Sequence, residues 1–299
     1  MMNEFTPNRM LNTASLLPFR QRNAMLDSLF YDVGALTAQE QSELQTLIDR
    51  EGSIIVVSPR DRGLPIRRYK NALRFINNEG DQVQAIVAAG VGSSGLGTAA
   101  LARNVADATA MDVAGIVTGY GLSDVLTESL GGWFFYGSID RWRLQWEKIG
   151  QQCFDLFPEE NANAKDKGVE TRRVALTGSD ETGTLLDILI SRPQSLKLLV
   201  GHSKGALLID FVLEHFLDEL GDGNHVYLEQ LHVVTLGAIV ALPHRFQHHH
   251  QFIGSKDWFG GLNSRLDIDH HSVPGAWHHL NPAFPQHLAV ANVLQTVTI

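Results

Sequence analysis

Residues 197–212 read KLLVGHSKGALLIDFV, in which one apolar run leads into GHSKG and a second apolar run follows it. The first run, 196–201, is short and apolar apart from Lys197, as in a buried strand. The second run, 206–220, has the spacing of an amphipathic helix and stops at Gly221. This stretch therefore predicts a strand, a tight turn at Ser203 and a helix, which is the unit from which α/β folds are built.

The two glycines of GHSKG have a physical reason. In a strand-to-helix turn this tight, the central residue adopts a strained backbone conformation, and the residues two before and two after it must be small. Gly201 and Gly205 meet that requirement around Ser203. The N–H of Lys204 would then lie at the helix N-terminus, where a developing oxyanion is stabilised. We expect His202 to pack within the turn.

With these flanks, GHSKG resembles the nucleophile elbow of the α/β-hydrolase superfamily, in particular of lipase- and esterase-like members that carry Gly-His-Ser-x-Gly. The resemblance covers about residues 172–290, whereas the residues before 172 match only in general α/β character. It implies an α/β-hydrolase-like fold with a mostly parallel sheet flanked by helices. It also implies a serine nucleophile followed along the chain by an Asp or Glu and then by a His.

The rest of the chain agrees with an α/β fold. Apolar strands alternate with helices, which indicates a parallel sheet covered on both faces, with any site at the carboxyl ends of the strands. We predict strands at 53–58, 82–90, 112–121, 172–178, 196–201, 231–240 and 251–257. We predict helices at 36–50, 97–109, 181–192, 206–220 and 284–297, the first with Thr37 and Glu40 in capping-box spacing. Without a linker or repeat, residues 1–299 are expected to form a single domain.

Residues 122–170 are expected to be an insertion over this domain, acting as a lid or cap. Six aromatic side chains gather in its first half: Trp133, Phe134, Phe135, Tyr136, Trp142 and Trp146. They would supply apolar surface for a greasy substrate. Burial of the same rings as ordinary core fits the sequence equally well.

The acid is expected soon after a late strand. The segment QFIGSKD places Asp257 in the turn after Gly254, similar to G-S-x-D stretches of related hydrolases. A turn-capping role is the ordinary alternative for an Asp in this position. Asp267 and Asp269, deeper in a polar loop, are the other candidates.

The base is expected in the loop before the last helix. VPGAWHH resembles the lead into the catalytic histidine of related hydrolases and indicates His278 or His279, which the sequence does not separate. His270, His271 and His287 are further candidates. A second oxyanion donor would come from a glycine-rich loop, either the one that contains Tyr120 or the one at 90–95.

The loop at 90–95 also spells a dinucleotide-binding fingerprint, Gly90-x-Gly92-x-x-Gly95, between a strand and a helix. The acidic residue that should hold a ribose hydroxyl about 20 residues later is missing, because 112–121 ends without Asp or Glu. Close helix packing or a supply of backbone N–H groups explains these glycines as well. An NAD(P)-binding oxidoreductase remains an alternative function.

Composition restricts the partners. The formal net charge of −9, without a concentrated basic stripe, disfavours nucleic acid. The basic cluster at 60–70 is expected to be a solvated loop. With Cys153 as the single cysteine, an internal disulfide and a Cys-based metal site are excluded. We expect no metal at His248–His250, because consecutive residues cannot aim three rings at one ion in regular structure.

No apolar run reaches the length of about 18 residues that suggests a membrane span, and we expect no integral membrane segment. The N-terminal stretch has no apolar core typical of a signal peptide, which predicts a cytoplasmic protein. A processed secreted form is compatible with the same residues.

Together these features predict a serine hydrolase that cleaves a small-molecule or lipid carboxylic ester through a Ser-His-Asp triad and an acyl-enzyme, without a cofactor. Acyl transfer to an acceptor other than water would use the same residues. A non-catalytic binding protein of hydrolase fold is the other alternative, and it would lack a histidine within reach of Ser203. Nothing in the sequence indicates the oligomeric state.

Overall fold

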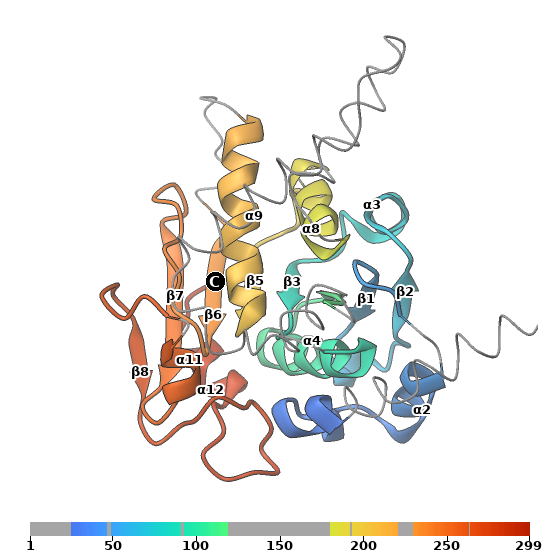
Figure 1. Cartoon of the computed structure of the whole chain (residues 1–299). Coiled ribbons are helices and arrows are strands. Elements are labelled where there is room, and N and C mark those ends of the chain that lie inside the picture. The colour runs from blue at the N-terminus through green and yellow to red at the C-terminus, as the bar shows by residue number, and fades with distance from the viewer. Residues whose placement is uncertain are drawn as a thin grey trace, which may run out of the picture.

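The computed structural model describes residues 25–46, 49–90, 93–118, 180–191, 193–220, 230–262 and 264–299. Their strands form one eight-stranded sheet in the order β2-β1-β4-β3-β5-β6-β7-β8 (Figure 1). The strands are β1 (Ile54–Val57), β2 (Arg67–Tyr69), β3 (Ala85–Ala88), β4 (Val113–Ile116), β5 (Leu198–His202), β6 (His232–Leu236), β7 (His248–Gly254) and β8 (His271–Val273). The predicted strand at 172–178 and the predicted aromatic insertion at 122–170 lie outside the described residues.

The helices are α2 (Ala38–Thr46), α3 (Ala72–Glu79), α4 (Gly95–Thr109), α8 (Asp180–Ser191), α9 (Lys204–Leu220), α11 (Trp258–Leu262) and α12 (Val290–Gln295), with short 3-10 turns η1 (Val33–Ala35) and η2 (Arg60–Arg62). Strands β3 to β8 run parallel, whereas β1 runs antiparallel to β2 and β4. The predicted α/β class, with a mostly parallel sheet flanked by helices, is confirmed.

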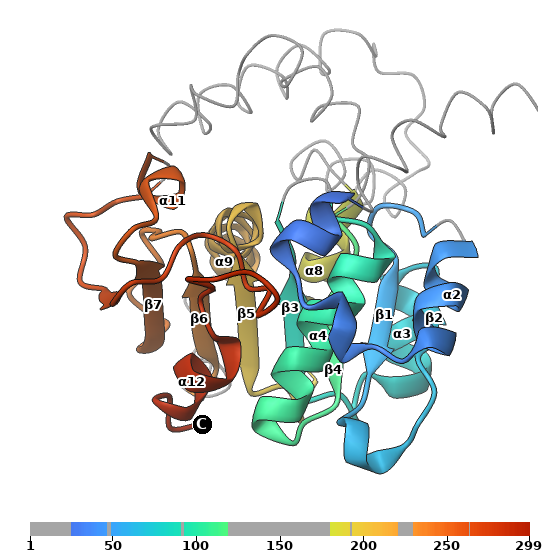
Figure 2. The same ribbon diagram turned by 90° about the horizontal axis from the view of Figure 1, so that it is seen from below.

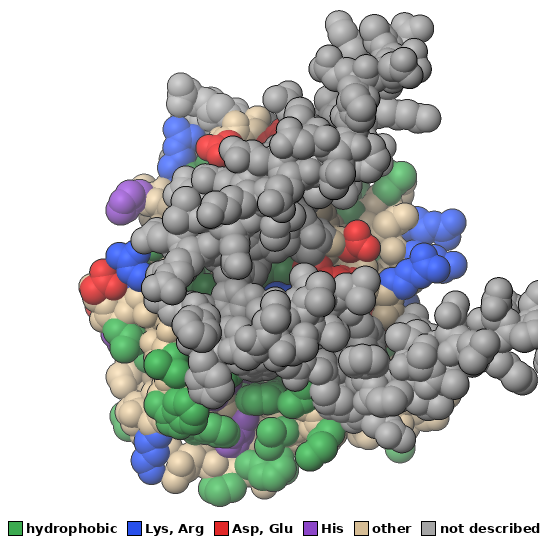
Figure 3. All heavy atoms as spheres, viewed as in Figure 1, with side chains coloured by type: hydrophobic (Ala, Val, Ile, Leu, Met, Phe, Trp, Pro, Cys, Tyr) green, Lys and Arg blue, Asp and Glu red, His purple; other side chains and the backbone are tan. Residues whose placement is uncertain are grey.

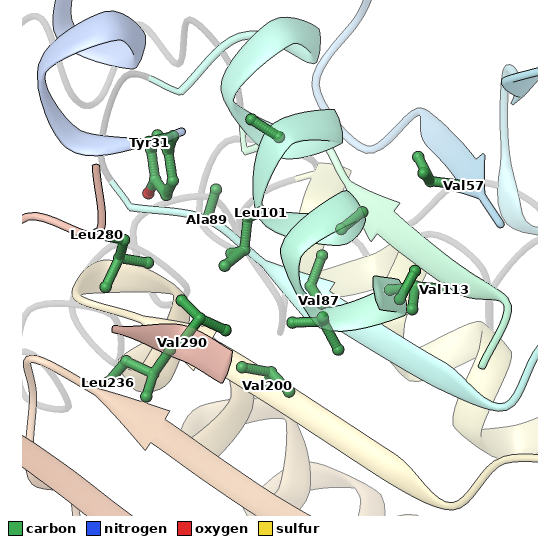
Figure 4. Packing of buried hydrophobic residues seen from close by; sticks show 14 of the residues in the cluster. Tyr31, Val57, Val87, Ala89, Leu101, Val113, Val200, Leu236, Leu280 and Val290 are labelled. Atoms are coloured by element: carbon green, nitrogen blue, oxygen red, sulfur yellow. The ribbon is translucent and has the colours of Figure 1, made fainter. Parts of the chain in front are cut away.

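Each face of the sheet has its own apolar core, because successive side chains of a strand point to opposite faces. Ile55 and Val57 of β1 pack with α4 and α12 on one face, whereas Ile54 and Val56 pack with α3, α8 and α9 on the other. Figure 2 shows α4 and α12 on the near face. Figure 4 shows the first core in detail, with Tyr31 at one end of it.

A capping box marks the start of α2. Thr37 and Glu40 form the predicted capping box: the Thr37 hydroxyl accepts from the N–H of Glu40, and the Glu40 carboxylate accepts from the N–H of Thr37.

The C-terminal helix is shorter than predicted and begins at Val290. Gln286 has a φ of 67°, in the left-handed region, so the backbone is not yet helical there.

The strands at the two edges of the sheet, and β7 beside one of them, differ most from the prediction. β2 lies within the basic cluster that was expected to be a solvated loop, and that expectation is wrong for Arg67 and Arg68, which form ion pairs with Glu79 and Asp49. β7 begins at His248, three residues before the predicted start. β8 was not predicted, because its three residues are polar or half-buried and lack an apolar pattern.

Candidate active site

Ser203 occupies the turn between β5 and α9, at the carboxyl end of a central strand. Its φ of 54° lies in the left-handed region, which costs a non-glycine residue about 1–3 kcal/mol. Its N–H donates to the carbonyl oxygen of Leu236 at the end of β6, at 2.9 Å. The neighbouring strand therefore supports a strained turn that leaves the Ser203 side chain half-buried.

The packing leaves no room for a side chain at either of the two flanking glycines. A Cβ at Gly201 would lie 2.6 Å from the backbone nitrogen of Ala206, and a Cβ at Gly205 would overlap the carbonyl oxygen of Ala88 on β3. Both contacts would be closer than real Cβ atoms come to other heavy atoms. The sequence argument for small residues around Ser203 is therefore matched by the packing.

His278 lies between the serine and an acid. Its Nε2 is 3.0 Å from Ser203 Oγ, and its Nδ1 is 2.7 Å from Asp257 Oδ2. Because a carboxylate can only accept, the neutral ring carries its proton on Nδ1 and turns the lone pair of Nε2 toward the serine hydroxyl. The structure therefore brings together Ser203, Asp257 and one of the two histidines that the sequence could not separate.

Asp257 also caps a helix. It precedes α11, and its Oδ1 accepts a hydrogen bond of 2.7 Å from the N–H of Gly260. The carboxylate is thus held at both oxygens, with its side chain completely buried. Asp257 therefore caps the turn, which is the ordinary role for an Asp in this position, and also orients His278. Gly260 was not singled out from the sequence, because any non-proline residue three positions after Asp257 would offer the same backbone N–H.

The His278 ring is enclosed by aromatic neighbours. Phe259 and Phe30 stand edge-on to it, with ring centroids 4.9 Å and 6.0 Å away. Gly237, with a φ of 68°, leaves room beside the ring, since a Cβ there would lie 3.0 Å from His278 Nδ1. Because the imidazole is only 2 % exposed, these contacts restrict its orientation and exclude water from its flanks.

His279 faces away from Ser203. Its Nε2 lies 3.2 Å from the carbonyl oxygen of Pro285, and its ring stands against Trp277 and Phe284. Successive residues on an extended backbone point their side chains in different directions. The structure therefore distinguishes His279 from His278 by orientation.

The remaining acid and base candidates lie elsewhere. Asp267 forms an exposed ion pair with Arg265, and Asp269 is exposed. His270 contacts the carbonyl oxygen of Ile268, His271 stacks on Phe252, and His287 is half-buried.

The Lys204 side chain is largely buried. It is 14 % exposed, with Nζ 3.9 Å from Oε1 of Glu181, whose side chain is 2 % exposed. The backbone of Lys204 begins α9. Tyr120 lies outside the described residues.

The start of α4 is occupied by an anion that the chain itself supplies. Asp27 accepts hydrogen bonds from the hydroxyls of Ser93 and Ser94 and from the N–H of Gly97. A dinucleotide fingerprint would place a pyrophosphate at this helix end. The buried carboxylate of Asp27 would repel that group, which disfavours dinucleotide binding at residues 90–95.

The histidine triplet lies in β7, where side chains alternate between faces. His250 and His248 approach the ring of His232 on β6, whereas His249 contacts the carbonyl oxygen of Phe246. Across the described ranges, no group of three or more His, Cys, Asp or Glu side chains could hold a metal ion.

Comparison with known proteins found no matching family model and no matching curated protein. Among the helices that the structure describes, none is long and apolar enough to cross a bilayer.

Proposed function

We propose that this protein is a serine hydrolase that cleaves carboxylic esters, similar to the lipase- and esterase-like α/β-hydrolases. One observation carries the proposal: His278 contacts Ser203 Oγ through Nε2 at 3.0 Å and Asp257 through Nδ1 at 2.7 Å. Such a base, oriented by a buried acid, is what a weakly nucleophilic serine hydroxyl needs for activation.

In the proposed reaction, Ser203 Oγ attacks the ester carbonyl carbon while its proton moves to Nε2 of His278. The imidazolium that forms is stabilised by Asp257, and the N–H of Lys204 donates to the oxyanion. Nε2 then returns the proton to the departing alkoxide, which leaves an acyl-enzyme on Ser203. Water then enters, loses a proton to the same nitrogen and attacks the acyl carbon. The bond from that carbon to Ser203 Oγ breaks, Nε2 returns the proton to Oγ, and the carboxylic acid leaves.

An apolar acyl group is favoured by the surface next to the acid. Trp258 and Leu262 of α11 and Leu266 just after it are more than half exposed, and Trp258 directly follows Asp257. Figure 3 shows hydrophobic side chains gathered on the lower part of the molecule, where Figure 1 draws α11. Large exposed apolar patches on soluble proteins commonly mark binding surfaces. The predicted aromatic surface at 131–146 lies outside the described residues.

Two observations favour this proposal over its alternatives. A non-catalytic binding protein was expected to lack a histidine within reach of Ser203, and His278 meets that serine at hydrogen-bond distance. An NAD(P)-dependent oxidoreductase needs an anion site at residues 90–95, where Asp27 already lies.

The deciding experiment is labelling with a fluorophosphonate probe, which phosphonylates an activated serine. We expect wild-type protein to label, Ser203→Ala to remain unlabelled, and Ser272→Ala, a change at an exposed position on β8, to label like wild type. Absence of labelling in folded wild-type protein would overturn the proposal. Turnover of p-nitrophenyl esters of increasing chain length, with and without an added alcohol acceptor, then separates hydrolysis from acyl transfer.

A further inference from the structure

A buried hydroxyl lies close to the turn that carries the serine. Tyr31, only 3 % exposed, accepts a hydrogen bond from the N–H of Gly90 at 2.5 Å, and its oxygen lies 2.9 Å from Nδ1 of His202. Gly90 follows β3 by two residues, and a Cβ there would lie 3.4 Å from Cβ of Ser203. Tyr31 thus joins two chain segments that flank the proposed nucleophile.

The contact continues to the base. Nε2 of His202 lies 3.0 Å from the carbonyl oxygen of His278. Because that carbonyl can only accept, Nε2 carries the proton of His202, and Nδ1 accepts the proton of the Tyr31 hydroxyl. The directions are therefore determined along the whole link: Gly90 N–H to Tyr31, Tyr31 O–H to His202, and His202 N–H to the backbone of His278.

This link depends on a neutral His202. Burial, reinforced by the charge of His278, lowers the pKa of His202 to about 3. A second proton would put an N–H on Nδ1, facing the hydroxyl that must donate to it. Buried donors and acceptors are costly when unpaired, so loss of one member disturbs the others.

Backbone contacts tie the same two regions together next to the link. The carbonyl oxygen of Ser28 accepts from the side-chain amide of Asn281 at 2.6 Å, and the carbonyl oxygen of Phe30 accepts from the N–H of Leu280 at 2.7 Å. The segment at 28–31 is therefore attached to the loop that carries His278 by hydrogen bonds at two positions, Ser28 and Phe30.

We propose that Tyr31 and His202 are positioning residues, which hold the backbone of His278 so that its Nε2 stays aligned with Ser203. The inference rests on the proposed function, because alignment matters only if His278 acts on that serine. The hydrogen bonds of these two residues go to other atoms than Ser203 Oγ and the ring nitrogens of His278: Tyr31 bonds Gly90 and His202, and His202 bonds the carbonyl oxygen of His278. Misplacement of a catalytic group by about 1 Å can cost about 100-fold in rate.

The test compares ester turnover by three variants. Tyr31→Phe removes the hydroxyl but keeps the ring, and His202→Leu removes the donor to His278; we expect each to lower kcat about 10-fold to 100-fold with little change in KM. His202→Gln keeps an N–H donor at about the reach of Nε2, and it should recover most of the loss. Tyr69→Phe is the matched control. Tyr69 lies on the edge strand β2, and its hydroxyl donates to Glu79. Loss of that hydroxyl should leave the wild-type kcat unchanged.

Failure of the inference differs from failure of the proposed function. If folded wild-type protein does not label with a fluorophosphonate, the serine hydrolase itself is wrong. If wild type labels and turns over esters, and Tyr31→Phe and His202→Leu keep its kcat while melting at lower temperature, the residues are merely structural and the inference is overturned. Equal losses in His202→Gln and His202→Leu would contradict it as well.

A measurement on the wild-type protein tests the link even if the variants do not fold. Nitrogen-15 NMR of histidine-labelled protein should show His202 as the neutral form protonated at Nε2 from about pH 5 to about pH 9. A proton on Nδ1, or titration of His202 within that range, would overturn the proposed link.

Discussion

Asp257 and His278 are joined by a hydrogen bond of 2.7 Å between Oδ2 and Nδ1, and both side chains are at most 2 % exposed. The other carboxylate oxygen is held by the N–H of Gly260. An acid that is held at both oxygens has one orientation available, and so has the imidazole that donates to it. This pair therefore determines which nitrogen of His278 faces Ser203.

Asp257→Asn should lower kcat/KM for an ester about 1,000-fold to 10,000-fold. The amide can donate to Nδ1 and so favours the wrong tautomer, in which Nε2 of His278 carries the proton and cannot accept one from Ser203. The measurement is steady-state turnover of a p-nitrophenyl ester. Asp267→Asn is the matched control, because Asp267 lies in an exposed ion pair and its loss should leave turnover near the wild-type rate. Equal losses in the two variants would contradict the assignment of the acid.

Replacement of the adjacent histidines should have unequal effects. His278→Gln should lower kcat about 10,000-fold or more, because Ser203 loses its base. His279→Gln should keep kcat within about 10-fold of wild type and lose about 1 kcal/mol of stability, because its ring contacts the carbonyl oxygen of Pro285 and faces away from the serine. Ester turnover and urea unfolding of both variants check this. If His278→Gln kept the wild-type turnover and His279→Gln lost it, His279 would be the base instead of His278.

The sequence predicts the turn at Ser203 well because its determinants are local. An apolar strand, small residues at Gly201 and Gly205 and an amphipathic helix all lie within 25 residues, 196–220. The choice between His278 and His279 depends instead on the path of a loop, to which both contribute the same residue type. Contacts made by the folded chain separate them: Phe30 and Phe259 pack around the ring of His278, whereas Nε2 of His279 contacts the carbonyl oxygen of Pro285.

The Tyr31 link was beyond sequence reasoning for a related reason. Tyr31 lies 59 positions from Gly90 and 171 positions from His202, and no spacing or motif marks the pair. The edge strand β8 was missed because its residues carry no alternation of apolar and polar types. Residue patterns encode periodicity within an element, whereas these features arise from contacts between elements.

Gly205→Ala should disrupt the turn. A methyl group there would overlap the carbonyl oxygen of Ala88 on β3, which cannot move without breaking the central sheet. Overpacking of this kind costs about 1–3 kcal/mol, and activity should fall with it because Ser203 shifts. Gly261→Ala, in the short helix α11, is the matched control, since the nearest atom to its Cβ would be 3.9 Å away on Leu266. Urea unfolding measures the difference, and equal stability of both variants would contradict the packing argument.

The buried carboxylate of Asp27 should make stability depend on pH. Burial raises its pKa from 3.8 to about 6, against the opposing effect of hydrogen bonds from Ser94 and Ser93. Between about pH 4 and about pH 6, the native state therefore holds a proton that the unfolded chain has lost. The free energy of unfolding should fall as pH rises through this window, by about 3 kcal/mol from this group.

Asp27→Asn removes this titration and should flatten the corresponding part of the curve, as measured by urea unfolding from about pH 4 to about pH 8. Asp210 provides a control with a different window: burial, reinforced by the charge of Glu214, raises its pKa to about 7. The difference between wild type and Asp210→Asn should therefore keep changing up to about pH 7, whereas the difference between wild type and Asp27→Asn levels off near pH 6. Parallel stability curves for wild type and Asp27→Asn would show that Asp27 is already ionised in the native state at low pH, and that the start of α4 stabilises the charge more strongly than burial opposes it.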